Sequence, residues 1–210
     1  NILSELKADK KLLWFIIASF FYIDGVYTII EMSTAYGKDV GIGDSSMLLA
    51  LLLTQVVAFP CSILFGRLAR RFESEKLIMV CIGADFFSAL FALQLDTAWK
   101  FWFLATCVGV FQGAIQALSR SYYAKIIPKE KASEYFGVFD IFGKGASFLG
   151  TMLMGISTQL FGTSKAGVVM IAVLFVLGFV TFCLQGRQAQ KGAQTQETNQ
   201  VQQKLQTQNL

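Results

Sequence analysis

Long apolar runs alternate with short polar segments along this chain. Six such runs occupy residues 12–31, 46–64, 77–95, 101–121, 138–161 and 166–184. About 20 apolar residues in a helix cross a bilayer core about 30 Å thick. A strand with open edges would leave its backbone groups unpaired in lipid. The pattern therefore predicts an all-α membrane protein, with six transmembrane helices in a bundle over residues 12–185 and sequential helices antiparallel.

The two ends of the chain lack this pattern. Residues 1–11 are mixed in charge, and residues 186–210 are rich in Gln, Thr and Asn with few apolar side chains. Such a composition is typical of a disordered or weakly helical tail. We expect both ends to be cytoplasmic segments. Because no initiator Met or signal peptide precedes the first run, we also expect the chain to be a piece of a longer protein.

Composition and charge agree with a membrane protein and set its orientation. The chain is 54% hydrophobic and 15% charged, whereas soluble domains are about 25% charged. Cytoplasmic loops of membrane proteins are enriched in Lys and Arg. With the N-terminus in the cytoplasm, all 18 lysines and arginines fall on that side except Lys38, Lys100 and Lys165 on the other and Lys144 inside a run. We therefore expect both termini in the cytoplasm, and the net charge of +4 gives no reason to expect a nucleic-acid partner.

Several chemistries are disfavoured by the residue types present. Cys61, Cys81, Cys107 and Cys183 lie in separate runs without a C-x-x-C pair, and the chain has no histidine. We interpret the cysteines as small buried hydrophobic residues and expect no metal site and no cofactor. Any proton moved near neutral pH would then have to be carried by a carboxylate.

The first run contains a polar stripe. Ionisable residues at membrane depth are costly, so each is a candidate functional residue. Asp24, Tyr27, Thr28 and Glu31 follow at i, i+3, i+4 and i+7, which places them on one helix face. We expect them to bind solute or couple its movement, with Asp24 as a candidate proton carrier and the following Gly25 loosening the helix. Two alternatives stay open: Asp24 hydrogen-bonds a neighbouring helix, and Glu31 lies at the membrane interface.

Further charges lie in the third and fifth runs. Asp140 and Lys144 stand at i and i+4 with the acid first, which favours an ion pair within the helix. This pair is either structural or a salt bridge that breaks and reforms as the protein moves. Asp85 has no partner in its own run, so it is a candidate proton carrier or a helix-packing hydrogen-bond donor.

The fourth run combines amides with glycines. Gln112 and Gln116 share one helix face, and Gly109 with Gly113 forms a G-x-x-x-G surface that lets another backbone approach. The amides either line a cavity for solute or join helices. Arg120 follows at the cytoplasmic end, where it binds lipid phosphate or helps to close an inner gate.

Several segments occur in the order known from one family: FYIDGVYTI, LLLTQVVAFP, GVFQGAIQALSRS, IIP and EYFGVFDIFGK. Through them, residues 14–184 resemble the C-terminal half of one branch of the major facilitator superfamily. That branch contains the autophagy-related vacuolar amino-acid effluxers of fungi and bacterial relatives often called unknown major facilitators.

This resemblance implies a twelve-helix transporter working by alternating access. Each six-helix half is a 3+3 inverted repeat, and the first, second, fourth and fifth helices of this half would line a central cavity. An N-terminal half, or a second copy, would complete the path. The resemblance also implies a multi-pass protein of a bacterial plasma membrane.

One loop departs from the superfamily's signature G-x-x-x-D-R-x-G. The chain reads GRLARRFE, so Gly66 and Arg71 match, whereas Arg70 replaces the Asp and Glu73 replaces the last Gly. The usual contact between the acid and a helix end is therefore not expected. We instead expect Arg70, Arg71 and Glu73 to form a different pairing on the surface. We expect a cytoplasmic gate formed by Gly66, Arg67, Arg70, Arg71 and Arg120.

Three classes of function are compared. The preferred one is a carrier of a small polar solute, with amino acids suggested by the resemblance and protons as a coupling ion. An intramembrane aspartyl protease is disfavoured because its Y-D and G-x-G-D motifs are absent, so we expect no enzyme activity. A membrane scaffold without transport would satisfy its polar residues internally and enclose no aqueous cavity. The carrier hypothesis requires that ionisable and amide groups inside the runs line a shared passage, and it would fail if Asp24 and Gln116 pointed toward lipid or lay sealed away from any opening.

Overall fold

The computed structural model describes residue 6 and residues 9–39, 41–94 and 97–208; most of the predicted N-terminal segment 1–11 lies outside them. Each apolar run lies on a helix, and the described residues contain no strand. The all-helical prediction is therefore confirmed. In chain order the helices are α2 (Lys10–Asp39), α3 (Asp44–Leu68), α4 (Ser74–Ala92), α5 (Ala98–Ile126), a short 3₁₀ turn η1 (Lys129–Lys131), α6 (Ala132–Phe161) and α7 (Ser164–Gln208).

Not every helix is equally suited to a bilayer. Within the described residues, four helical segments are long and apolar enough to cross a membrane: Lys10–Glu31, Asp44–Leu68, Ala98–Ile126 and Lys165–Arg187. Helix α4 is short and carries Glu75, Lys76 and Asp85. Helix α6 is continuous, but glycine, serine and charged residues lie among its apolar residues. Four of the six expected spans therefore meet this criterion.

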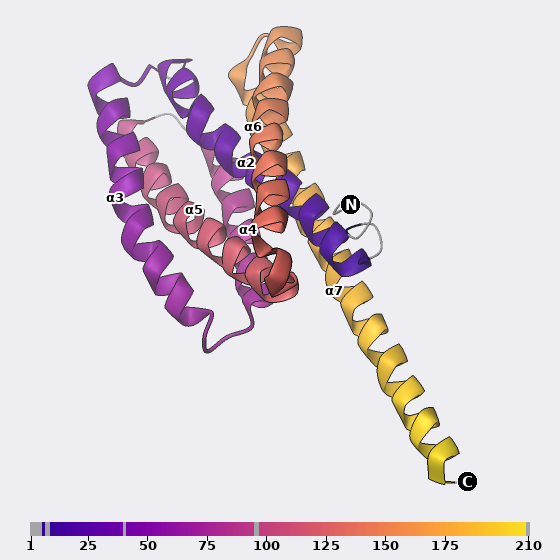
Figure 1. Cartoon of the computed structure of the whole chain (residues 1–210). Helices are drawn as coiled ribbons and strands as arrows, with labels where there is room; N and C mark the ends of the chain where they lie inside the picture. The colour runs from indigo at the N-terminus through magenta and orange to yellow at the C-terminus, as the bar shows by residue number, and fades with distance from the viewer. Residues whose placement is uncertain (1–5, 7–8, 40, 95–96, 209–210) are drawn as a thin grey trace.

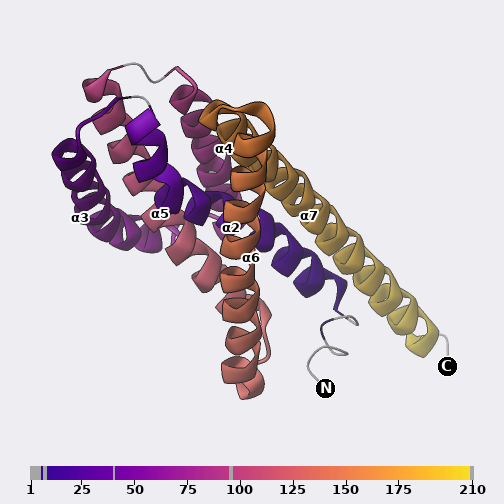
Figure 2. The same ribbon diagram turned by 90° about the horizontal axis from the view of Figure 1, so that it is seen from above.

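The helices pack in two connected groups. Helix α5 lies against α3 and α4, α2 lies against α6 and α7, and α4 also contacts α7. Figure 1 and the view from above in Figure 2 show α3 and α5 side by side, with α6 and α7 on the opposite side of α2. Helix α7 extends far beyond the bundle as an unbroken helix to Gln208. Ala, Gln and Lys favour helix and no proline interrupts this segment, and the disordered or weakly helical tail after Gln185 stays a prediction.

The G-x-x-x-G surface of α5 meets α3. A Cβ added at Gly109 would lie 2.7 Å from the carbonyl oxygen of Thr54, and one at Gly113 would overlap the carbonyl of Ala58. The two backbones approach this closely because both α5 residues lack a side chain. The predicted backbone contact is therefore confirmed, and its partner is the face of α3 that carries Thr54 and Ala58.

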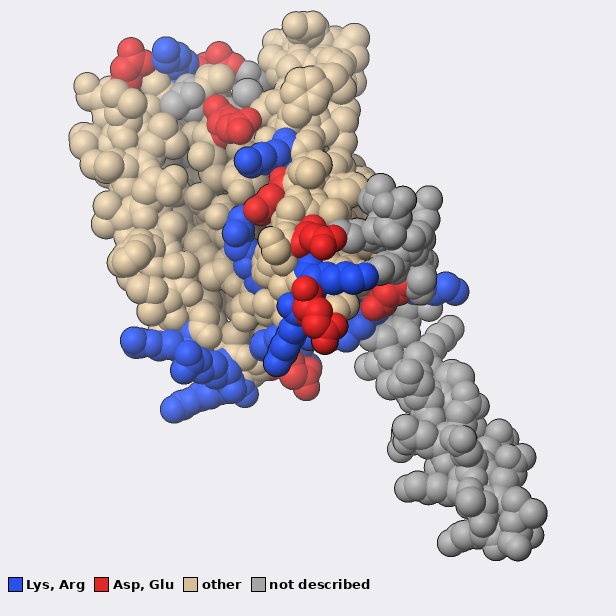
Figure 3. All heavy atoms as spheres, viewed as in Figure 1, with Lys and Arg blue, Asp and Glu red and all other residues tan. Residues whose placement is uncertain are grey.

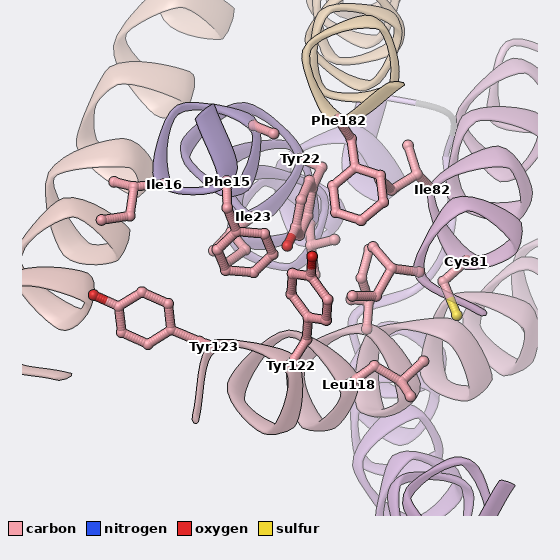
Figure 4. Close-up of a cluster of buried hydrophobic side chains, with 14 of the residues drawn as sticks. Phe15, Ile16, Tyr22, Ile23, Cys81, Ile82, Leu118, Tyr122, Tyr123 and Phe182 are labelled. Carbon is pink, nitrogen blue, oxygen red and sulfur yellow. The ribbon is translucent and has the colours of Figure 1, made fainter. Parts of the chain in front are cut away.

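An aromatic core joins α2, α5 and α7. Phe15, Tyr22, Tyr123 and Phe182 are almost fully buried. Figure 4 shows Tyr22 of α2 and Tyr122 of α5 pointing toward one another, with Phe182 of α7 beside them. The core therefore fixes these three helices at the end of the bundle where α2 begins and α5 ends.

The outer surface is mostly apolar. Helix α3 exposes one side, including Leu48, Leu52, Val56, Phe59 and Ile63. Figure 3 shows uncharged residues over the flank of the bundle and most Lys and Arg side chains toward one end. This distribution is typical of a protein whose flanks face lipid or another apolar domain.

Candidate functional site

A polar hollow of about 280 Å³ lies between α2, α5 and α6. Each of the three helices contributes one face, with Gln116 and Arg120 one turn apart on α5 and Asp140 and Lys144 one turn apart on α6. The residues around it are Ile23 and Tyr27 of α2, Gln116, Ser119 and Arg120 of α5, and Phe139, Asp140, Gly143 and Lys144 of α6.

The hollow gathers five of the residues singled out from the sequence. Tyr27, Gln116, Arg120, Asp140 and Lys144 come from three separate apolar runs, yet all line this one space. The i, i+4 spacing of the pairs on α5 and α6 explains why both members of each pair face the same way. Hydroxyl, amide and charged groups of both signs are therefore available to a solute in one place.

The ion pair in the hollow differs from the expected one. Asp140 Oδ1 lies 2.9 Å from Nη2 of Arg120 on α5, and no ion pair with Lys144 occurs in the described residues. The prediction of an intrahelical Asp140–Lys144 pair is therefore wrong for this structure. The reason is that α5 and α6 both border the hollow, so the long Arg120 side chain reaches the acid across it. Lys144 remains at the rim, exposed.

Asp24 is sealed beside the hollow and does not line it. Its side chain is fully buried, and Oδ1 accepts a hydrogen bond of 2.9 Å from the backbone N–H of Gly150 and a longer one of 3.4 Å from the Thr28 hydroxyl. Among the described residues, its Oδ2 has no hydrogen-bond partner. Asp24 therefore forms the hydrogen bond to a neighbouring helix that was given as the alternative to a role in solute binding. Ile23 and Tyr27 lie on the side of α2 that borders the hollow. Asp24, between them in the sequence, points in a different direction around the helix axis and contacts Gly150 of α6.

Gly25 serves packing. A Cβ added there would lie 3.0 Å from the ring of Phe175 on α7, and α2 runs as one unbroken helix through this position. The loosened helix expected at Gly25 is therefore absent. The glycine instead lets an aromatic ring lie directly on the backbone of α2.

The other sequence candidates lie apart from the hollow. Glu31 is exposed near the far end of α2, consistent with the interface alternative. Gln112 is buried with its Oε1 unpaired, and Asp85 is buried in α4 with Oδ2 unpaired. Thr28 is buried beside Asp24. The amide of Gln116 thus faces the cavity, whereas that of Gln112, one turn away, does not.

The arginines expected to form a cytoplasmic gate are exposed or engaged with another partner. Arg67, Arg70 and Arg71 are exposed where α3 leads into α4, while Arg120 is engaged with Asp140 in the hollow. A Cβ added at Gly66 would meet nothing within 4 Å. Glu73 pairs with Lys76 at 3.1 Å, so the pairing expected between Glu73 and the arginines is also replaced. Glu73 is the N-cap of α4 and Lys76 lies in the first turn of that helix, whereas Arg70 and Arg71 lie in the turn before it.

A polar network at the same end of the bundle was missed by the sequence reasoning. The Tyr122 hydroxyl donates to Oε1 of Glu75 at 2.5 Å and accepts from Nε2 of Gln185 at 2.8 Å. Next to it, Lys125 Nζ donates to the hydroxyl of Ser74 at 3.0 Å. The network joins α4, α5 and α7. The sequence did contain a signal for this network, because its polar residues all lie at those ends of the apolar runs that are expected on the cytoplasmic side.

A pair of hydroxyl groups links the aromatic core to the hollow. The hydroxyl groups of Tyr22 and Ser119 are 2.8 Å apart, and Ser119 also lines the hollow. Within the described residues, no group of three or more Cys, His, Asp or Glu side chains is arranged to hold a metal ion. The site therefore offers hydrogen bonds and charge as its means of binding.

The chain is a helical bundle with apolar flanks and a polar hollow between its helices, and comparison with known proteins gives its family. The chain belongs to the family described as vacuole effluxer Atg22 like, whose sequence profile matches residues 1–197. It is 47% identical over 178 residues to the uncharacterized MFS-type transporter YxiO of Bacillus subtilis (strain 168), covering 85% of this chain and 42% of that protein.

More distant similarity extends to fungal proteins. The chain is 25% identical over 194 residues to autophagy-related protein 22 of Vanderwaltozyma polyspora, covering 87% of this chain and 37% of that protein. It is 29% identical over 162 residues to autophagy-related protein 22 of Saccharomyces cerevisiae (strain S288c), covering 71% and 31%. The chain thus spans less than half the length of these relatives. The resemblance to this branch of the major facilitator superfamily is confirmed.

Proposed function

We propose that this chain is the C-terminal six-helix half of a secondary active transporter that moves a small polar solute by alternating access. The observation that carries the proposal is the hollow between α2, α5 and α6, because it gathers charged, amide and hydroxyl groups from three apolar helices. Burying such groups without a ligand or water is costly in a membrane. A scaffold that satisfied its polar residues internally would have no need of this space.

We propose that a second half of the transporter covers the open side of the hollow. The side chains of Arg120 and Asp140 are 59% and 47% exposed. Both nevertheless belong to apolar runs, Arg120 at the end of the fourth and Asp140 near the start of the fifth. An N-terminal six-helix half is our proposed cover. It would also shield the more polar helices α4 and α6, so that all six helices cross the bilayer. The relatives are long enough for such a half, since YxiO has more than half of its length outside the match.

The charge distribution supports an orientation. The last turn of α3 carries Arg67, the last turn of α5 carries Lys125, and η1 carries Lys129 and Lys131. Because cytoplasmic loops are rich in such residues, we place this end in the cytoplasm together with both chain termini. The similarity to a Bacillus protein supports a bacterial plasma membrane as the location.

Amino acids are the solute class that we propose. The support is the sequence resemblance to vacuolar amino-acid effluxers, together with a family described as vacuole effluxer Atg22 like. An amino acid has an ammonium and a carboxylate group, and the hollow has charges of both signs to meet them.

Asp24 is our candidate for the coupling group. It is sealed between α2 and α6 with one oxygen unpaired, so an ionised carboxylate there would lack full compensation. We propose that it holds a proton in this state and releases it when α6 moves away from α2. Its position beside the hollow, next to Ile23, would let solute binding and proton release share one helix movement.

The test is uptake into liposomes that contain the full-length protein. Vesicles are given a mixture of radiolabelled amino acids, with and without an imposed proton gradient, and empty vesicles are the control. We expect accumulation that increases with the gradient and is lost in Asp24→Asn. Absence of uptake for every amino acid in either direction would reject the proposed solute class, and gradient-dependent uptake in Asp24→Asn would reject its coupling role.

A further inference from the structure

Three charged groups share the hollow, and one of them has a choice of partner. Asp140 pairs across the hollow with Arg120 of α5 at 2.9 Å. Lys144 lines the same hollow one turn further along α6, at the i+4 position that suits an acid-first ion pair. One acid therefore stands between two cations, on different helices.

We propose that the hollow binds a carboxylate group of the solute at Arg120, and that this carboxylate displaces Asp140, which then pairs with Lys144. The proposal rests on the proposed function, because it names the solute group that this half of the carrier recognises. It also assigns separate roles: Arg120 binds the solute, whereas Asp140 is the group that is exchanged.

The charge balance of the hollow favours an anion. Its lining has two cations and one acid, so among the described residues one positive charge has no counter-ion. A solute carboxylate supplies the missing negative charge, and two ion pairs result. An amine without a carboxylate would add a third cation and no anion, whereas an amino acid adds a carboxylate for Arg120 together with an ammonium that Asp140 can share with Lys144. Like charges cost more where water is excluded, as under a covering partner half.

Arg120 has the geometry to accept the group. A guanidinium has five N–H donors in a planar fork, which matches a carboxylate, and Asp140 is hydrogen-bonded to Nη2. Gln116 lies one turn earlier on the same face of α5 and lines the hollow. Its amide N–H groups can donate to the second carboxylate oxygen. Ile23 and Phe139 supply apolar lining for the remainder of the solute.

The exchange would have a mechanical consequence. The Arg120–Asp140 pair joins α5 to α6, whereas an Asp140–Lys144 pair lies within α6 alone. Carboxylate binding therefore removes a link between two helices that border the solute. A ligand shifts a conformational equilibrium only through such a difference in contacts between two states. Occupancy of the hollow is thereby coupled to the freedom of α6 to move.

The experiment measures thermal stabilisation of the purified full-length protein by two simple compounds. Isocaproate is leucine without its amino group, and isopentylamine is leucine without its carboxylate. A compound that binds the folded state raises Tm in proportion to its concentration and affinity. We expect isocaproate to raise Tm and isopentylamine to leave it unchanged. Stabilisation by the amine alone, or by neither compound, would overturn the proposal.

Two variants separate the roles of the ion-pair partners. We expect Arg120→Gln to raise the isocaproate concentration for half-maximal stabilisation about tenfold or more, because the binding cation is gone. We expect Asp140→Asn to lower that concentration or leave it unchanged, because the competing acid is gone. Glu134→Gln, at an exposed acid in the first turn of α6, is the matched control and should behave as the parent protein.

The outcomes distinguish this inference from the proposed function. An equal loss of isocaproate binding in Arg120→Gln and Asp140→Asn would mean a static structural ion pair and would reject the exchange. Uptake in liposomes reports on transport independently. Carboxylate stabilisation without any uptake would reject amino-acid transport while leaving the site, and uptake of solutes that lack a carboxylate would reject the site while leaving transport.

Discussion

The backbone N–H of Gly150 on α6 donates a hydrogen bond of 2.9 Å to Oδ1 of Asp24 on α2. The contact is possible only because position 150 has no side chain: a Cβ there would overlap both Asp24 Oδ1 and Thr28 Oγ1. Beside the hollow, α2 and α6 therefore approach each other through a glycine and a buried acid.

Gly150→Ala should destabilise this contact. The added methyl group forces Asp24 and Thr28 to move, and overpacking of this kind costs about 1–3 kcal/mol. The measurement is Tm of the full-length protein in detergent. Gly155→Ala on the same helix is the control, since a Cβ there meets nothing within 4 Å, and it should be neutral or slightly stabilising. Equal effects of the two changes would contradict the close contact.

The contact between α3 and α5 gives a second stability prediction. Gly113→Ala places a methyl group against the carbonyl of Ala58, which is backbone and cannot rotate away. We expect a loss of about 1–3 kcal/mol, seen as a lower Tm. Gly83→Ala on α4, where the space is open, is the comparison. A Gly113→Ala protein as stable as Gly83→Ala would show that the two backbones are not in contact.

The network around Tyr122 predicts coupling between α4 and α5. Tyr122→Phe removes the hydroxyl and leaves the Gln185 amide, already buried with Oε1 unpaired, without its partner. We expect a cost of about 1–3 kcal/mol. A double-mutant cycle with Glu75→Gln measures the interaction, because Tyr122 donates to that carboxylate. Additive effects of the two changes would show that the hydrogen bond contributes nothing to stability.

Solvent access distinguishes the two glutamines of α5. Gln116 lines the hollow, whereas Gln112, one turn away, is 7% exposed. In a full-length protein freed of its native cysteines, Gln116→Cys should react with a membrane-impermeant thiol reagent applied from the cytoplasmic side. Gln112→Cys should react far more slowly. Similar rates at both positions would mean that the hollow is not a passage for water, and protection of position 116 by an amino acid would support binding there.

Local sequence patterns were sufficient for the helices and for part of the site. Each apolar run lies on a helix because run length and the cost of unpaired backbone in lipid are properties of the segment itself. The spacing of Gly109 and Gly113 likewise identified a surface for close packing. Residues spaced by four, such as Gln116 and Arg120, were placed on one face correctly because helix geometry fixes their relation.

The sequence by itself thus determined which segments form helices and which residues share a face of one helix. Only the tertiary structure decided which faces meet: Arg120 with Asp140, Asp24 with Gly150, and Tyr122 with Gln185. The physical reason is that periodicity defines directions around each helix axis but not the rotation and shift of one helix against another. Those depend on packing summed over the whole bundle, which brings together residues as distant as Asp24 and Gly150.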